Sequence, residues 1–574
     1  MKLSSQAVSL GKKKEFFSKR FSLLLGLAAL SLLLPGQATA QTIVNTTFVI
    51  NDAQTTYTPD QIWVTFAGTF TDSGSPQTAG TTALTDSTWQ SFNLTQLLAP
   101  VDNTVSTDGT VTSTPVAFFD GNEEYTFSLN DFSGRVYINY GSSALTVAPN
   151  PGDPGTSPYI VFEPTVLGTT LAPPAPTASN MDLSYVDGVS APAGTGVRDG
   201  TTGASLAATS NNPITTNPNI LNNVAALVPA AADVYNGNTL VRVMSSAADP
   251  SAYHSWDSLL TTLETTTATT PLNVSSYTSP LTGPPPGLNG ALFGYAGTGT
   301  VIVPGAPVNF NAAQSYNTTT QFVTNMTQGL NSTQITALAG VGITSTTAGA
   351  VITGSGSVAG NFQIFITNSS MEAGTGIYGN NPGYYVMVGN TLYSYSSTGI
   401  QNDLAGRVVG DLMAGIVFGW SNSTVNIATW AASTGTNLYG ATFSSTTVGG
   451  LSTGEYFYLL SLAAAQGKLS DWIGSNADSN LNDYDEYLAA VTANTDAYAS
   501  GFTDRLQGPG APGTFWYTAN PPANVDPPPA NYQTAGFVEF DLDGPSSAPE
   551  PSTISFIGLS GLLLLLLHKW RKPA

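Results

Sequence analysis

Two carboxylic acids near strand ends are the residues whose type and spacing could do chemistry. Glu163 closes the apolar segment 159–163, and Asp187 lies near the end of a second apolar segment, 182–189, 24 residues further on. Adjacent strands would bring both acids to one face of a sheet. Glycosidic cleavage requires such a pair, because one carboxyl group protonates the leaving oxygen while the other activates water or attacks the sugar. With 36 acidic residues in the chain, turn caps and exposed strand ends are the competing interpretation.

Composition excludes several other chemistries. The chain has no Cys and only two His residues, His254 and His568, which rules out thiolate nucleophiles, disulfides and multi-histidine metal centres. His254, with Trp256 and Asp257, either lines a sugar subsite or is an ordinary polar residue near a helix start. The segment 478–489 begins like a calcium-binding loop but lacks the Gly and Glu that an EF-hand requires. We therefore expect no metal site and no cofactor.

The charge balance argues against nucleic acid as a partner. The 574 residues include 15 basic and 36 acidic side chains, for a formal net charge of -21. Nine of the bases lie in the two terminal segments, so the body is more acidic still and repels phosphate backbones. The bases of the body are Arg135, Arg198, Arg242, Arg407, Lys468 and Arg505.

The N-terminal segment is typical of a secretory signal peptide. Residues 1–22 are basic, residues 23–34 are apolar or small, and small residues precede and include Ala40. The alternative is a membrane anchor, but twelve residues span only about 18 Å as a helix, less than the ~30 Å bilayer core. We expect residues 1–40 to be removed by signal peptidase after Ala40.

The C-terminal segment combines a small motif, an apolar run and a basic tip. Pro549, Glu550 and Pro551 precede the run 554–567, and residues 568–572 are mostly basic. This combination resembles the PEP-CTERM sorting signal of Gram-negative bacteria. The resemblance implies export across the inner membrane, transient anchoring by a transmembrane helix at 554–567, cleavage by an exosortase-type peptidase, and a cell-surface or secreted product. The alternative is a plain C-terminal anchor.

The first half of the body reads as β-structure. Apolar β-branched or aromatic residues alternate along 61–66, 125–129 and 135–140, with Gly, Pro, Asn and Asp between the segments. We predict short antiparallel strands in a sandwich or barrel over residues 41–215. A stretch rich in Pro, Gly, Ser and Thr, at about 189–220, predicts a long connection.

The second half mixes helices and strands. We expect a mixed α/β domain over 216–510, a segment at 511–545 that returns to the first domain through a strand at 536–542, and the sorting signal at 546–574. The expected helices start near Leu404, at 453–467 and at 482–500, the last with Asn482 as N-cap, and further strands are expected at 301–303 and 362–366.

Short motifs along the body resemble glycoside hydrolase family 64, the thaumatin-like β-1,3-glucanases. These motifs are residues 133–137, 162–163, 182–189, 240–245, 403–407, 482–488, 496–498 and 502–505. The resemblance implies a β-rich α+β fold, in which a groove separates a thaumatin-like β-sandwich or barrel domain from a mixed α/β domain. The loop 168–180 between the two acids is an insertion relative to this family.

The resemblance also implies a function. The chain would be an inverting endo-β-1,3-glucanase acting on laminarin-like polysaccharide, with Glu163 as general acid and Asp187 as general base. Thr165, Asp504 and Tyr487 match positions with a substrate-binding role. The alternative is a catalytically inactive protein of the extracellular matrix that binds glycan or is purely structural.

Overall fold

The structure is a computed structural model. The residues that it describes are 46–52, 55–70, 77–79, 82–84, 89–97, 103–105, 111–113, 124–129, 132–166, 179–198, 216–274, 298–301, 308–311, 317–356, 360–395, 404–421, 426–429, 443, 445–465, 469–476, 484–495, 497–500, 514–518, 532–534 and 537–542.

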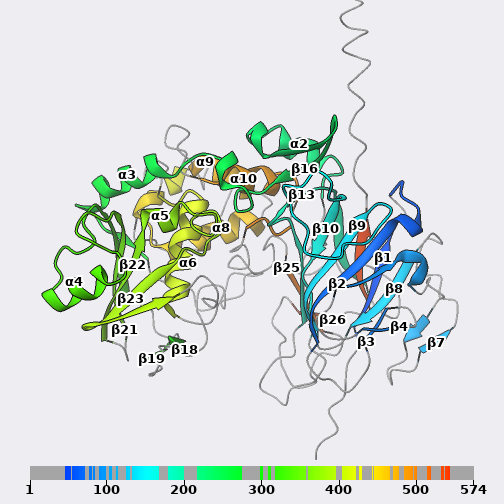
Figure 1. The fold of residues 1–574 in the computed structure, drawn as a ribbon, viewed down its shortest axis with the longest axis horizontal. Coiled ribbons are helices and arrows are strands. Elements are labelled where there is room, and N and C mark those ends of the chain that lie inside the picture. The colour runs from blue at the N-terminus through cyan, green and yellow to red at the C-terminus, as the bar shows by residue number, and fades with distance from the viewer. Residues whose placement is uncertain are drawn as a thin grey trace, which may run out of the picture.

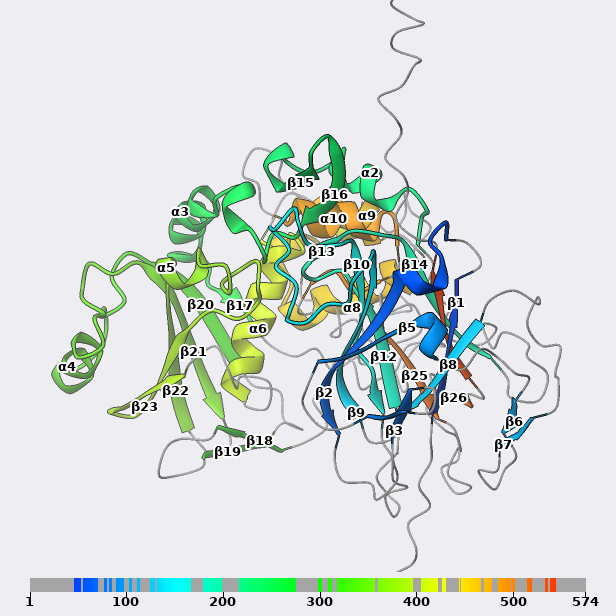
Figure 2. The ribbon, with the colours of Figure 1, turned by 45° about the vertical axis from the view of Figure 1, so that its right-hand side comes forward.

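The first domain is a sandwich of two sheets (Figures 1 and 2). One sheet has the order β14-β27-β1-β8-β3-β4, with strands Ala193–Arg198, Phe537–Leu542, Thr46–Asn51, Glu124–Leu129, Gln77–Ala79 and Thr82–Leu84. The other has the order β26-β25-β12-β10-β9-β2-β5, with strands Tyr532–Thr534, Thr514–Thr518, Ser179–Ser184, Tyr159–Phe162, Phe132–Tyr140, Ile62–Phe70 and Gln90–Asn93. A short strand β11 (Thr165–Val166) pairs with both β12 and β9.

Aromatic side chains fill the space between these two sheets. The rings of Phe162 and Phe540 stack with their centroids 3.9 Å apart, and Phe127 meets Phe66 edge-on at 5.0 Å. Each pair consists of one residue from each sheet, so both pairs connect the two sheets. Residues that alternate with them, such as Arg135 on β9, therefore face outward from the sandwich.

The strand β27 comes from the far end of the chain. It is parallel to β1 and antiparallel to β14, and it lies between them in the sheet. The strand expected at 536–542 is thus an interior strand of the first domain, with Val538 and Phe540 fully buried.

A small sheet and several helices link the sandwich to the rest. The order is β13-β16-β15, with strands Gly188–Val189, Thr239–Met244 and Asp233–Asn236. Nearby helices are α2 (Ile220–Ala225), α9 (Leu469–Asn476) and α10 (Glu486–Thr492), beside the upper end of the sandwich in Figure 2.

The second domain is built on a twisted antiparallel sheet, β17-β20-β21-β22-β23-β24. Its strands are Leu272–Asn273, Asn317–Val323, Gly349–Gly356, Gly360–Thr367, Tyr384–Val388 and Thr391–Tyr395. The helices α6 (Leu404–Val417) and α8 (Thr453–Ala465) lie on the side of this sheet nearer the sandwich (Figures 1 and 2). The remaining elements are α3 (Asp257–Thr267), α4 (Ser332–Ala339), α5 (Asn368–Met371), the hairpins β6–β7 (Asn103–Val105, Val111–Ser113) and β18–β19 (Thr298–Val301, Val308–Asn311), and the 3-10 turns Pro59–Gln61, Leu94–Gln96, Ala230–Ala232, Pro250–Ala252 and Val448–Gly450.

The helix expected at 482–500 is shorter than its sequence pattern predicts. α10 covers only Glu486–Thr492, and its N-cap is Asp485, whose side chain accepts from the backbone N–H groups of Tyr487 and Leu488. The expected cap Asn482 lies outside the described residues. The sequence does not single out the first residue of this helix, because Asn482, Asp483 and Asp485 are all residue types that can cap a helix.

The described ranges contain no helix that is long and apolar enough to cross a bilayer. The expected transmembrane segment 554–567 lies outside those ranges. The expected signal peptide, residues 1–40, lies outside them as well.

Candidate active site

Glu163 follows β10 directly and projects from the outer side of the sandwich. Phe162, the residue before it, is fully buried in the core, so alternation along the strand turns Glu163 outward. Its backbone N–H donates to the carbonyl of Asp182 at 3.0 Å, which continues the pairing of β10 with β12. The Glu163 side chain is 25% exposed.

Asp187 does not end a single strand, as the sequence pattern predicts. β12 ends at Ser184, the chain bends through 185–187, and β13 begins at Gly188. Gly188 has φ 150°, and a Cβ there would lie 2.6 Å from the carbonyl oxygen of Val243. Only glycine tolerates this close passage. The bend brings Asp187, 35% exposed, back toward the outer face that carries Glu163.

Arg135 joins the two acids. It lies on β9 and donates from Nε to Glu163 Oε1 at 2.6 Å and from Nη1 to Asp187 Oδ2 at 3.2 Å. Since both oxygens bind one planar guanidinium, they lie no more than about 8 Å apart. Inverting glycosidases place their carboxyl groups roughly 6.5–9.5 Å apart and retaining ones roughly 5–5.5 Å. The pair is therefore close enough for either pathway.

The electrostatics of the site are dominated by this one cation. Burial lowers the pKa of Arg135, but Glu163, Tyr137 and Asp187 together outweigh burial and raise it above its ordinary value. The pKa of Tyr137 is also raised, chiefly by burial. Arg135 is therefore permanently charged and the Tyr137 phenol is protonated at neutral pH.

Aromatic rings lie beside the acid pair on the same face. Tyr137 is two residues from Arg135 on β9 and accepts from its Nη1 at 3.4 Å. The ring of Trp89 lies 5.3 Å from that of Tyr137 and is partly exposed. Tyr159 on β10 is buried and packs against Tyr137. A partly exposed indole on this face offers an apolar surface to a sugar ring.

Arg135, Tyr137 and Trp89 were not singled out as functional residues by the sequence reasoning. The signal for Arg135 was present, because it is one of six bases in an acidic body and must be paired with something. Nothing in the sequence places Trp89 near residue 137, since that contact depends on the register of the sheet.

Of the other predicted site residues, one is described on a strand and the others lie outside the described ranges. Thr165 lies on β11, opposite Ser133 and Asn180, close in the chain to Glu163. Asp504 lies outside the described residues. The processing residues Ala40, Pro549, Glu550 and Pro551 also lie outside them.

Tyr487 cannot contact a substrate directly, which corrects the sequence-based expectation. Its side chain is fully buried, and its hydroxyl donates to the backbone carbonyl of Tyr185, two residues before Asp187. The backbone N–H of Tyr185 in turn donates to the carbonyl of Tyr498 at 2.7 Å. Tyr487 thus supports the bend that carries Asp187. A sequence motif alone cannot show whether such a residue binds substrate or supports the backbone.

His254 does not form a sugar subsite either. Its side chain is 8% exposed, with Nδ1 3.3 Å from Glu486 Oε2 and its ring edge-on to Trp256 at 4.5 Å. It is a buried polar residue before α3, which is the alternative that the sequence left open. Among the residues that the structure describes, no group of three or more His, Asp or Glu side chains is arranged to hold a metal ion.

Comparisons with known proteins find similarity only to solved structures. No family model matches the chain, and no curated protein is significantly similar to it. The chain is similar to a laminaripentaose-producing β-1,3-glucanase in complex with laminaritetraose, at 13% identity and a TM-score of 0.41, over 87% of this chain and 98% of that one. It is similar over the same shares to a β-1,3-glucanase domain (GH64) from Clostridium beijerinckii, at 10% identity and a TM-score of 0.41.

A third similar structure is a GH family 64 laminaripentaose-producing β-1,3-glucanase from Paenibacillus barengoltzii complexed with laminarihexaose. Its identity is 13% and its TM-score 0.23, over 38% of this chain and 53% of that one.

Proposed function

We propose that the protein hydrolyses β-1,3-glucan, with Glu163 and Asp187 as its acid–base pair. The observation that carries the proposal is that Arg135 binds both carboxylates at once on the outer face of the sandwich. Two acids that are 24 residues apart in the chain thus meet at one partly exposed point, and the ring of Trp89 packs on Tyr137, which contacts the same arginine. The motifs that resemble family 64 contain both acids.

The proposed reaction is single displacement with inversion. Glu163, as general acid, donates its proton to the departing glycosidic oxygen. Asp187, as general base, removes a proton from a water molecule, and that water attacks the anomeric carbon from the opposite face of the ring. The oxygens that bind Arg135 lie no more than about 8 Å apart, a limit compatible with the roughly 6.5–9.5 Å spacing of inverting pairs.

The test is incubation of the protein with laminarin, following product length and anomer by NMR. We expect short oligosaccharides released as the α-anomer. Glu163→Gln and Asp187→Asn should each lower turnover by roughly 10²–10⁴-fold, because each removes one proton transfer. The matched control is Glu264→Gln, a partly exposed acid on α3. Wild-type hydrolysis by Glu163→Gln would refute the assignment, and release of the β-anomer would refute inversion.

A second function is favoured by one feature of the same site. Arg135 Nε donates to Glu163 Oε1 at 2.6 Å, so this carboxyl oxygen is bound to a cation and is not open to a glycosidic oxygen. A protein in which that contact persists would bind glycan without cleaving it. Laminarin that is retained but not cleaved, by wild type and Glu163→Gln alike, would identify the protein as this glycan-binding or structural matrix component.

We also propose that the chain is exported and processed. The support is its sequence alone: a signal-like segment at 1–40 and a PEP-CTERM-like segment at 546–574. Mass spectrometry of the protein from its native host should find an N-terminus at Gln41 and no residues from the 554–567 run. A mature protein that retains both segments would contradict the proposal.

A further inference from the structure

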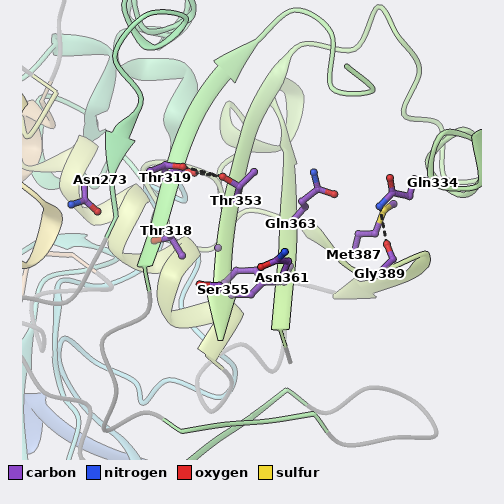
Figure 3. Close-up of a pocket in the computed structure, with 12 residues that line it drawn as sticks. Asn273, Thr318, Thr319, Gln334, Thr353, Ser355, Asn361, Gln363, Met387 and Gly389 are labelled. Atoms are coloured by element: carbon purple, nitrogen blue, oxygen red, sulfur yellow. Dashed lines mark hydrogen bonds between the residues drawn. The ribbon is translucent and has the colours of Figure 1, made fainter. Parts of the chain in front are cut away.

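A concave surface lies on the sheet of the second domain. It has a volume of about 700 Å³, within the 300–1,000 Å³ of typical ligand sites, and most of its lining residues stand on the face of the sheet opposite Ile352 and Ile364 (Figure 3). We call it the threonine-face pocket. Its lining residues are Asn273, Thr318, Thr319, Gln334, Thr353, Gly354, Ser355, Asn361, Phe362, Gln363, Met387 and Gly389.

Strand register places one polar row across the floor of this pocket. Asn273, Thr319, Thr353 and Gln363 stand opposite one another on four successive strands, β17, β20, β21 and β22, and the buried Met387 of β23 ends the row. Neighbouring strands lie about 4.8 Å apart, so the row repeats a polar side chain at that interval for about 14 Å. Figure 3 shows Thr319, Thr353 and Gln363 in line along it.

The pocket is held in shape by its own hydrogen bonds. The hydroxyls of Thr319 and Thr353 are 2.9 Å apart on adjacent strands. Gln334 on α4 forms one wall, because its Nε2 donates to the carbonyl of Gly389 at 2.8 Å while its Oε1 accepts from the N–H of Asn331 at 3.0 Å. A ligand would therefore meet a wall that is already ordered.

The chemistry of the lining selects the class of ligand. None of the twelve residues is ionisable, in a chain of net charge -21, so the pocket offers nothing to a cation, a phosphate or a charged peptide. It offers hydroxyl and amide groups, which both donate and accept hydrogen bonds. A hydroxyl-rich, uncharged polymer that crosses the strands meets these groups at a regular interval.

We propose that the threonine-face pocket binds a neutral oligosaccharide chain, separately from the acid pair. The opposite face of the same strands, with Ile352 and Ile364, is buried in the core that also contains Val408 of α6. Glu163 and Asp187 belong to the other domain, after β10 and before β13. One glycan chain can therefore occupy the pocket while another occupies the acid pair. Only the choice of a β-1,3-glucan probe rests on the proposed function.

The experiment is calorimetric titration of the Glu163→Gln protein with laminarihexaose. We expect two binding sites. Adding Gln363→Glu, which places a charge in the row at almost constant volume, should weaken one site at least tenfold. Adding Gln321→Glu is the matched control, because Gln321 is an exposed residue on the same face of β20 that does not line the pocket. The double change Thr319→Val and Thr353→Val should act like Gln363→Glu, and circular dichroism verifies the fold of each variant.

The outcomes separate the two proposals. A single site that Gln363→Glu and the valine variant leave unchanged overturns the pocket. If the Gln321→Glu control also loses the second site, the pocket proposal is overturned, because an added negative charge outside the pocket would then be enough to weaken binding. If wild type fails to hydrolyse laminarin, and binding at one site is lost only in the Gln363→Glu and valine variants, the pocket stands and the proposed hydrolase does not.

Discussion

At the scale of single residues, one arginine holds the two acids together. Arg135 binds Glu163 and Asp187 and is itself in contact with the Tyr137 hydroxyl. A substrate oxygen that reaches Glu163 Oε1 therefore has to displace the guanidinium first.

Removing that cation should lower hydrolysis by loosening the acid pair. In Arg135→Met nothing holds Glu163 and Asp187 at one point, so kcat/KM should fall at least tenfold. Arg135→Lys keeps the charge without the planar fork and should lose less. The measurement is the initial rate on laminarin. An unchanged kcat/KM in Arg135→Met would show that the ion pair in the free protein has no part in the reaction.

The partly exposed indole of Trp89, packed on Tyr137, should contribute to binding rather than to chemistry. Trp89→Ala removes the apolar face next to Tyr137 and should raise KM about fivefold to tenfold, with kcat nearly unchanged. Trp89→Phe keeps an aromatic face and should lose less. Steady-state kinetics on laminari-oligosaccharides separates KM from kcat, and a loss confined to kcat would contradict a binding role.

At the scale of elements, the start of α10 contains a buried carboxyl group. Asp485 caps the helix, its Oδ2 accepts from the Ser246 hydroxyl at 2.6 Å, and burial raises its pKa from 3.8 to about 6. Because the folded state holds this proton more tightly than the unfolded state, the contribution of Asp485 to stability is greatest below pH 4. It falls as pH rises from about 4 to 6.

Asp485→Asn should remove that pH dependence and keep the cap. The difference in free energy of unfolding, wild type minus variant, should fall by up to about 3 kcal/mol between pH 4 and pH 7. Urea unfolding at several pH values measures it. The control Ser246→Ala removes the hydroxyl and leaves the carboxyl group in place, so its pH dependence should persist. A difference that stays constant with pH would mean that Asp485 ionises normally.

The sequence predicted strands and helices correctly where a pattern of buried side chains is enough to determine them. The β-branched alternation at 61–66, 125–129 and 135–140 became β2, β8 and β9, and the apolar run at 453–467 became α8. The prediction failed where a tertiary contact decides. The 182–189 segment reads as one strand, but the approach of Gly188 to Val243 of β16 breaks it into β12, a bend and β13.

The acid pair was predictable in part. Its two members could be named because they follow apolar segments, and their common face follows from the pairing of β10 with β12. The guanidinium between them could not be placed from the sequence. Its position depends on β9 lying on the other side of β10, with Tyr137 opposite Val161.

At the scale of the whole molecule, the first domain depends on the last strand. β27 fills the space between β1 and β14, and its Phe540 stacks on Phe162, the residue before Glu163. A protein ending at residue 548 should fold, whereas one ending at 535 leaves two strand edges open and should aggregate or be proteolysed. Limited proteolysis and thermal unfolding compare the two, and equal stability would contradict a structural need for β27.

The same strand sets a time at which folding can finish. β1 is made within the first tenth of the chain, but the neighbour that completes its sheet is not made until residues 537–542. Until then the nascent sandwich keeps an unpaired edge and an uncovered aromatic core. Contacts this distant in the chain also slow folding. Synthesis of nearly the whole polypeptide therefore precedes closure of the domain that carries the acid pair, which leaves a long interval in which the unfinished chain can be threaded through a translocation channel or be bound by a chaperone.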